Sequence, residues 1–106
     1  GSKYVLQNFN KVKVYGLTKS VYEDGGEWPE GLDYVLQNSD ENNANVYAYV
    51  LAYTIYKNGK EWPEGLDYVL QNGDKTQIEL LTTLIYRNGK EWPEGKAYLE
   101  KHGIEK

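Results

Sequence analysis

Few side chains in this sequence could do chemistry. The one histidine, His102, lies close to the C-terminal end, and cysteine is absent. A catalytic site needs a nucleophile or a tuned acid–base pair within reach of each other. A lone histidine in the last turn of a predicted helix is better explained as a cation that favours the helix C-terminus. We therefore predict a non-enzyme with no catalytic residue, no metal ligand and no cofactor.

Acidic residues recur in small groups, of which Glu27, Glu30 and Asp33 form the first. Such a group could supply a pair of catalytic carboxylates or a metal site. Acidic residues also favour the first turn of a helix and solvated surfaces, which explains the groups without a ligand. The sequence has no histidine or cysteine cluster of metal-binding spacing and no glycine-rich phosphate loop.

Aromatic residues are the one compositional excess, with eleven tyrosines and three tryptophans among 106 residues. Such residues serve both protein cores and recognition surfaces. The tryptophans Trp28, Trp62 and Trp92 recur at one position of a repeated sequence, which favours a structural role in packing between units. A platform for stacking sugars or bases is the alternative.

The repeat itself is strict. The segment Glu27–Asn38 recurs unchanged as Glu61–Asn72, a third copy begins at Glu91, and Tyr4–Asn8 matches the tail of the segment. Repetition at a period of roughly 20 to 50 residues is typical of stacked units that cannot bury their apolar faces alone. We divide the single domain into units of about 4–33, 34–67 and 68–106, with a four-residue insertion within 39–45 and residues 1–2 as a tag remnant.

Each unit also has a variable segment, and the three are Val12–Tyr22, Val46–Tyr56 and Thr76–Tyr86. Their β-branched and aromatic residues favour a strand. Aligned on their last tyrosines, however, the copies stay apolar or small at positions i, i+3, i+4, i+7 and i+8, which form one face of an α-helix. A strand would need alternate positions to agree. We predict helices, and a strand–helix repeat of α+β class is the alternative.

The ends of the variable segments support helices. The last tyrosine of each variable segment is followed three residues later by a glycine, namely Gly25, Gly59 or Gly89. A helix often ends at such a position on a residue in the left-handed conformation. Asp74 is a predicted N-cap. The positions predicted to be buried are Val14/Ala48/Ile78, Leu17/Leu51/Leu81, Thr18/Ala52/Thr82, Val21/Ile55/Ile85 and Tyr22/Tyr56/Tyr86.

The constant segment predicts a second helix that begins at its proline, because proline suits the first helical position. In the third copy Lys96 replaces Leu32 and Leu66, and Glu100 replaces Leu36 and Leu70. Polar residues at these positions are typical of a capping unit with no following neighbour, so we expect the array to end there.

Leu51-Ala52, Ile55-Tyr56 and the turn Lys57-Asn58-Gly59 resemble the first helix and turn of tetratricopeptide-type and pentatricopeptide-type helical repeats. The turn is one residue longer than in those motifs, and Gly31, Gly65 and Gly95 stand where the second helix usually has alanine. The resemblance implies an all-α fold of about three helix-turn-helix units, a short α-solenoid. It also implies binding of peptides, of proteins or, in the pentatricopeptide case, of single-stranded RNA.

A variable face on a constant scaffold is typical of a repeat protein that binds a partner. The middle unit is the best candidate, because three tyrosines and Val50 would form an apolar, hydrogen-bonding patch. Thr54 and Leu84 are also expected on this outer face. The predicted binding residues are Lys13, Lys19, Tyr47, Tyr49, Val50, Tyr53, Gln77 and Thr83. The same tyrosines could instead belong to an internal core or to an interface between copies.

Three functions are therefore compatible with the sequence. The first is a module that presents its tyrosine-rich helix face to a peptide or protein partner. The second is a structural or engineered scaffold without a natural ligand, which could self-associate. The third is a single-stranded nucleic-acid binder, against which the net charge of −4 argues. That charge also argues against anionic membranes, no segment is long and apolar enough to span a bilayer, and we expect a cytoplasmic location.

Overall fold

The computed structural model describes residues 11–37 and 44–102. The predicted tag remnant at residues 1–2, the partial copy at Tyr4–Asn8 and most of the insertion lie outside these ranges. The described residues form six helices and no strand: α2 (Lys11–Glu23), α3 (Pro29–Gln37), α4 (Ala44–Lys57), α5 (Pro63–Asn72), α6 (Lys75–Arg87) and α7 (Pro93–Lys101). The all-α prediction is confirmed, and the strand–helix alternative is wrong for the described part of the chain.

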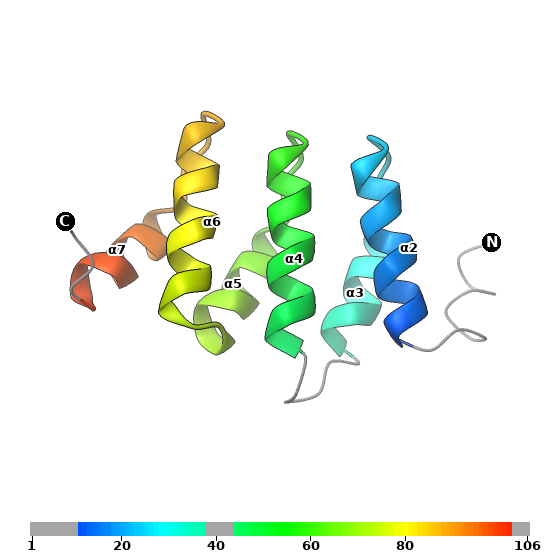
Figure 1. The fold of residues 1–106 in the computed structure, drawn as a ribbon, viewed down its shortest axis with the longest axis horizontal. Helices are drawn as coiled ribbons and strands as arrows, with labels where there is room; N and C mark the ends of the chain where they lie inside the picture. The colour runs from blue at the N-terminus through cyan, green and yellow to red at the C-terminus, as the bar shows by residue number, and fades with distance from the viewer. Residues whose placement is uncertain (1–10, 38–43, 103–106) are drawn as a thin grey trace.

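The helices lie in two layers (Figure 1). A front row is formed by α2, α4 and α6, which stand side by side, and a back row by the shorter α3, α5 and α7. Each front helix contacts the back helix that follows it in sequence, and α4 also contacts both of its front neighbours, α2 and α6. Among the described residues, no helix is long and apolar enough to cross a membrane.

Local sequence signals set where these helices begin and end. The back helices begin at Pro29, Pro63 and Pro93, as predicted. Asp74 caps α6, since its carboxylate accepts the Gln77 backbone N–H at 2.8 Å while its own N–H donates to the Gln77 side chain at 3.2 Å. This reciprocal arrangement satisfies two backbone donors that the helix leaves without partners.

The front helices end at glycine, as predicted. Gly25, Gly59 and Gly89 have φ values of 88°, 83° and 83°, in the left-handed region that residues with a Cβ rarely adopt. After α4 the Lys60 N–H donates back to the Ile55 carbonyl at 3.0 Å, which closes the last turn. The Asn-Gly pairs are therefore helix stops and not hairpin turns.

The helical pattern correctly predicts most of the core. Val14, Ala48, Ile78, Ile55 and Ile85 are fully buried. Three predicted core residues are not: Leu17 is 37% exposed, Tyr86 is 38% exposed and Val21 is half-buried, although their counterparts in the middle pair are buried. The reason is position, because α2 is the first helix and α6 belongs to the last pair in the described part of the chain.

Two residues expected on the outer face are buried instead. Thr54 is 7% exposed and Leu84 is 6% exposed. A front helix packs in two directions, backward onto a back helix and sideways onto its neighbours in the row. The sideways contact buries Thr54 in α4 and Leu84 in α6, which lie outside the apolar face predicted from the helical pattern.

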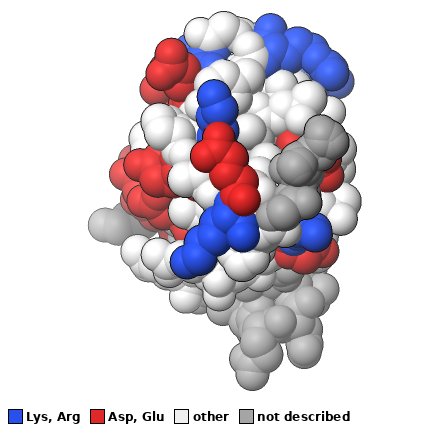
Figure 2. All heavy atoms as spheres, turned by 90° about the vertical axis from the view of Figure 1, so that its left-hand side faces the viewer, with Lys and Arg blue, Asp and Glu red and all other residues white. Residues whose placement is uncertain are grey.

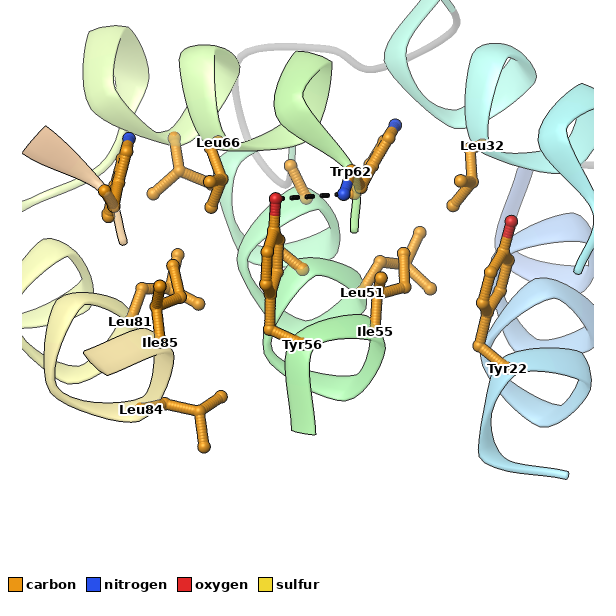
Figure 3. Packing of buried hydrophobic residues seen from close by; sticks show 14 of the residues in the cluster. Tyr22, Leu32, Leu51, Ile55, Tyr56, Trp62, Leu66, Leu81, Leu84 and Ile85 are labelled. Carbon is orange, nitrogen blue, oxygen red and sulfur yellow. Dashed lines mark hydrogen bonds between the residues drawn. The ribbon is translucent and has the colours of Figure 1, made fainter. Parts of the chain in front are cut away.

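A tyrosine and a tryptophan join the two helices of a pair. The Tyr56 hydroxyl accepts the backbone N–H of Trp62 at 3.0 Å (Figure 3), and Tyr22 accepts that of Trp28 at the same distance. The bond crosses from the end of the front helix to the residue before the back helix. It satisfies a donor that lies in a buried position.

The tryptophan also packs over the glycine three residues later. A Cβ added at Gly31, Gly65 or Gly95 would overlap the indole of Trp28, Trp62 or Trp92, respectively. This contact explains why glycine recurs at the place where the resembled helical repeats have alanine, because the ring occupies the space that a methyl group needs.

Ion pairs connect successive pairs of helices. Lys60 Nζ lies 3.0 Å from Glu27 Oε2, and Lys90 Nζ lies 3.2 Å from Glu61 Oε2. In the first unit the corresponding position is Gly26. Because the glutamates are largely exposed, each ion pair contributes at most about 1 kcal/mol to stability. Both ion pairs connect equivalent positions of successive helix pairs, and they therefore favour one register between these helix pairs.

The packing of tryptophan on glycine predicts the effect of a substitution. Gly65→Ala should lower the free energy of unfolding by about 1–3 kcal/mol, since the methyl group must displace the Trp62 ring. Gly16→Ala is the matched control, because it is a helical glycine whose Cβ would meet nothing within 4 Å. The control should raise stability by roughly 0.5–1 kcal/mol. Urea unfolding of both variants checks this, and two effects of the same sign would contradict it.

The hydrogen bond to tryptophan gives a second prediction. Tyr56→Phe should cost about 1–3 kcal/mol in urea unfolding, because it leaves the buried Trp62 N–H without its acceptor. Tyr86→Phe changes the equivalent but exposed tyrosine of the last unit and should cost less than about 0.5 kcal/mol. Equal costs at the two positions would show that the hydrogen bond does not matter.

Candidate functional site

A groove of about 500 Å³ runs along the outer surface of the front row. It lies mainly on α4, with one side on α2 and the other on α6. We call it the tyrosine groove, and its lining residues are Lys19 and Glu23 on α2, Tyr49, Val50, Tyr53, Thr54 and Lys57 on α4, Asn58 directly after α4, and Leu80 on α6. Three helices from three units are therefore needed to form it.

The two tyrosines of the groove lie one turn apart on α4. The ring centroids of Tyr49 and Tyr53 are 6.0 Å apart with an angle of 57° between the ring planes. This tilted geometry is one that aromatic pairs prefer. Both rings are half-buried, and Val50 and the exposed Leu80 add apolar surface beside them. The groove thus offers apolar contact together with two hydroxyl groups.

Charged groups stand at one end of the groove. Lys19 and Glu23 form an ion pair one turn apart on α2, while Lys57 lies in the last turn of α4 and is exposed. The Asn58 side-chain amide donates to the Thr54 carbonyl at 2.7 Å, and this carbonyl also accepts the Asn58 backbone N–H at 3.1 Å. Two ammonium groups and one carboxylate therefore line the groove, and the Asp74 carboxylate lies near Tyr49.

Burial changes the acidity of Tyr49. Loss of solvation raises the pKa of its hydroxyl above the ordinary value, and the nearby Tyr53 and Asp74 act in the same direction. Burial also raises the pKa of Tyr15. Since an ordinary tyrosine ionises near pH 10, both hydroxyls are neutral at physiological pH and can donate hydrogen bonds as well as accept them.

Four of the eight predicted binding residues come together in the groove, namely Lys19, Tyr49, Val50 and Tyr53. The other four lie elsewhere. Tyr47 stacks on Tyr15 of α2, with centroids 4.5 Å apart and ring planes 20° apart. This stack connects α4 to α2, so its two facing ring surfaces are already in contact with each other.

The remaining three predicted residues have separate positions. Gln77 forms the capping box of α6 with Asp74. Thr83 is exposed and lines a smaller hollow of about 240 Å³ beside Tyr86 and Lys96. Lys13 is exposed on α2 and does not line the tyrosine groove.

Five lining residues were not among the predicted binding residues: Glu23, Thr54, Lys57, Asn58 and Leu80. Thr54 and Leu80 occupy variable positions of their helices, which was a usable signal. Lys57 and Asn58 have the residue types of an ordinary helix end. Only the arrangement of the front row places them at the groove.

The tryptophans lie away from the groove. Trp62 and Trp92 are each 3% exposed and belong to the core between the two layers (Figure 3). Their ring faces are covered in this arrangement. Sugars or bases could not stack on them without unpacking the core.

The other chemical candidates also have simple surroundings. His102 is exposed and stacks on Tyr98, with ring centroids 4.2 Å apart. Over residues 11–37 and 44–102, no group of three or more histidine, cysteine or acidic side chains is placed to hold a metal ion. A second hollow of mixed lining, of about 310 Å³, is bordered by residues that include Tyr22, Glu27 and Glu61.

The raised pKa values predict how the protein responds to alkali. Tyr15, Tyr22, Tyr49 and Tyr56 are stabilised in their neutral form by burial. Their contribution to stability is complete below about pH 10, the pKa in the unfolded chain, and is lost as pH rises toward the higher folded values. We expect the free energy of unfolding to fall as the pH rises above about 10.

Tyrosinate absorbance measured against pH checks this directly. Part of the absorbance change in the folded protein should occur at higher pH than in the protein unfolded in urea, and Tyr49→Phe should remove part of this late fraction. Superimposable titrations of the folded and unfolded protein would contradict the prediction.

Compared with protein-family models, with curated protein sequences and with solved structures, the chain matches none of them.

Proposed function

We propose that the chain is a short α-solenoid that binds a peptide or protein partner through the tyrosine groove and is not an enzyme. One observation carries the proposal. The lining residues of the groove differ from copy to copy, whereas Pro29–Gln37 of α3 and Pro63–Gln71 of α5 are identical in sequence. Packing alone does not require a different set of outward residues in each copy of an otherwise constant unit.

The size and lining of the groove support this function. Its volume of about 500 Å³ lies within the roughly 300–1,000 Å³ typical of ligand sites. Tyrosine is among the residues that contribute most to binding, since it combines apolar area with a hydroxyl group. A groove of this size accommodates a few side chains of a peptide and not a whole folded domain.

A structural scaffold that self-associates is the second candidate. It is favoured by Leu80, which is 47% exposed at the edge of the groove, because a second copy could cover it. Sedimentation at rising protein concentration separates the two functions. A groove for a different partner predicts a monomer, whereas self-association predicts an oligomer that Tyr49→Ala with Tyr53→Ala disrupts.

The double variant Tyr49→Ala/Tyr53→Ala also tests binding. Both rings are only half-buried, so we expect the variant to remain helical by circular dichroism and to lose about 1–2 kcal/mol of stability. Peptides selected on the wild-type chain from a random displayed library should bind the variant at least about tenfold more weakly, equivalent to about 1.4 kcal/mol.

Tyr34→Ala/Tyr68→Ala provides the matched control, because these half-buried tyrosines lie on the back helices α3 and α5. The control should bind the selected peptides as the wild type does. If the Tyr49→Ala/Tyr53→Ala variant unfolds, these tyrosines are core residues and the binding function is wrong.

A further inference from the structure

The net charge of −4 is divided unevenly between the two layers. The front helices α2, α4 and α6 contain six basic and two acidic residues, which gives the row a charge of +4. The back helices α3 and α5 contain four acidic residues and no basic residue, and α7 contains two of each sign. The net charge of the chain therefore does not describe the surface that carries the groove.

Figure 2 looks at the molecule from the α7 side. Acidic side chains lie at the centre and toward the right edge of this view beside basic ones, and a further group lies along the left edge. Turning the molecule from Figure 1 to Figure 2 brings the back row to that edge and the front row to the opposite one. The end of the molecule that faces the viewer carries both signs.

The helix dipole explains only part of the basic residues of the front row, namely Lys57 and Arg87 in the last turns of α4 and α6. Acidic residues stabilise the first turn of a helix and basic residues the last. The back helices follow this rule with Glu30, Glu64 and Glu94 in their first turns. The front helices have no acidic residue there, and α6 begins with Lys75. The dipole therefore does not account for Lys75, which directly follows the N-cap Asp74.

At the groove, these charges lie beside apolar surface. Lys19 and Lys57 line it from α2 and α4, and only Lys19 has a carboxylate partner, Glu23, among the lining residues. Potentials from exposed charges act over about 8–10 Å at moderate salt. An approaching ligand therefore responds to the cations of the front row more strongly than to the acids behind it.

On the basis of the proposed function, we propose that the partner of the tyrosine groove is an acidic peptide segment with an apolar or aromatic side chain. That side chain contacts Tyr49, Tyr53 and Leu80, while the carboxylates of the segment lie near Lys19 and Lys57. Long-range attraction to the front row steers the peptide to the groove, and apolar contact holds it there.

A peptide fits the groove better than a single-stranded nucleic acid, the other common anionic chain. Successive bases stack on open aromatic faces along a strand. Tyr49 and Tyr53 are inclined at 57° to each other, and Tyr15 and Tyr47 already stack on one another. The aromatic residues therefore offer one pocket for a side chain and not a series of parallel platforms.

The test is selection of peptides from a random displayed library on the wild-type chain, followed by binding of the enriched peptides as labelled synthetic copies. We expect sequences rich in Asp and Glu around an apolar or aromatic residue. Their affinity should fall at least about tenfold between roughly 0.05 M and 0.5 M salt, because screening shortens the range of attraction.

A charge reversal makes the test specific to the groove. Lys57→Glu should weaken the acidic peptides at least about tenfold. The matched control is Lys101→Glu, which reverses a lysine that is likewise exposed and in the last turn of a helix, α7, and it should change the affinity less than twofold. Both reversals oppose the helix dipole equally, so a difference between them reports contact with the ligand.

The outcomes separate this inference from the function on which it rests. Enriched peptides that need Tyr49 and Tyr53 but are neutral or basic would overturn the acidic partner and leave the binding function standing. The absence of any peptide that depends on these tyrosines would overturn both. A labelled oligouridylate that binds more tightly than the best peptide, and loses binding in the Tyr49→Ala/Tyr53→Ala variant, would replace the peptide with nucleic acid.

Discussion

The packing of each tryptophan over the glycine three residues later is the contact on which the two-layer arrangement depends. The indole fills the space above the first turn of a back helix, where a Cβ would overlap it. In the first two pairs, the backbone N–H of the tryptophan donates a hydrogen bond to the hydroxyl of the tyrosine at the end of the front helix. Together these contacts fix how one helix of a pair follows the other, and the core between the layers forms around them.

The packing of tryptophan on glycine recurs in all three units, which leaves the outer positions of the front helices free to differ. The sequences of Pro29–Gln37 in α3 and Pro63–Gln71 in α5 are identical, and the first turn of each helix must leave room for the tryptophan ring. A change on the exposed side of α4 does not alter those contacts. The tyrosine groove therefore lies outside these contacts, where a substitution leaves the packing of tryptophan on glycine unchanged.

Charge follows the same division. The back row carries acids that suit helix starts, whereas the front row has a net positive charge, part of which lies in last turns that suit cations. A single figure for net charge averages these layers and hides the positive row. The negative net charge therefore disfavours only those anionic partners that would approach the back row.

Repetition in the sequence alone gave the correct helices. Aligning the copies separates positions that all units need from positions that vary, and this comparison favoured helices over the strands that residue propensity suggested. The caps at Asp74, Gly59 and Gly89 and the proline starts were also predictable, because they depend on local backbone geometry.

Only the tertiary structure decided which outward residues meet. Tyr47 and Tyr49 both lie on α4 and are two residues apart, yet one stacks on Tyr15 and the other lines the groove. Thr54 and Leu84 are buried because the front helices also pack against each other. The pattern within one helix reports which side is apolar, but the sideways contacts between helices depend on how neighbouring units lie in space. These contacts place Lys57 and Leu80 beside the tyrosines.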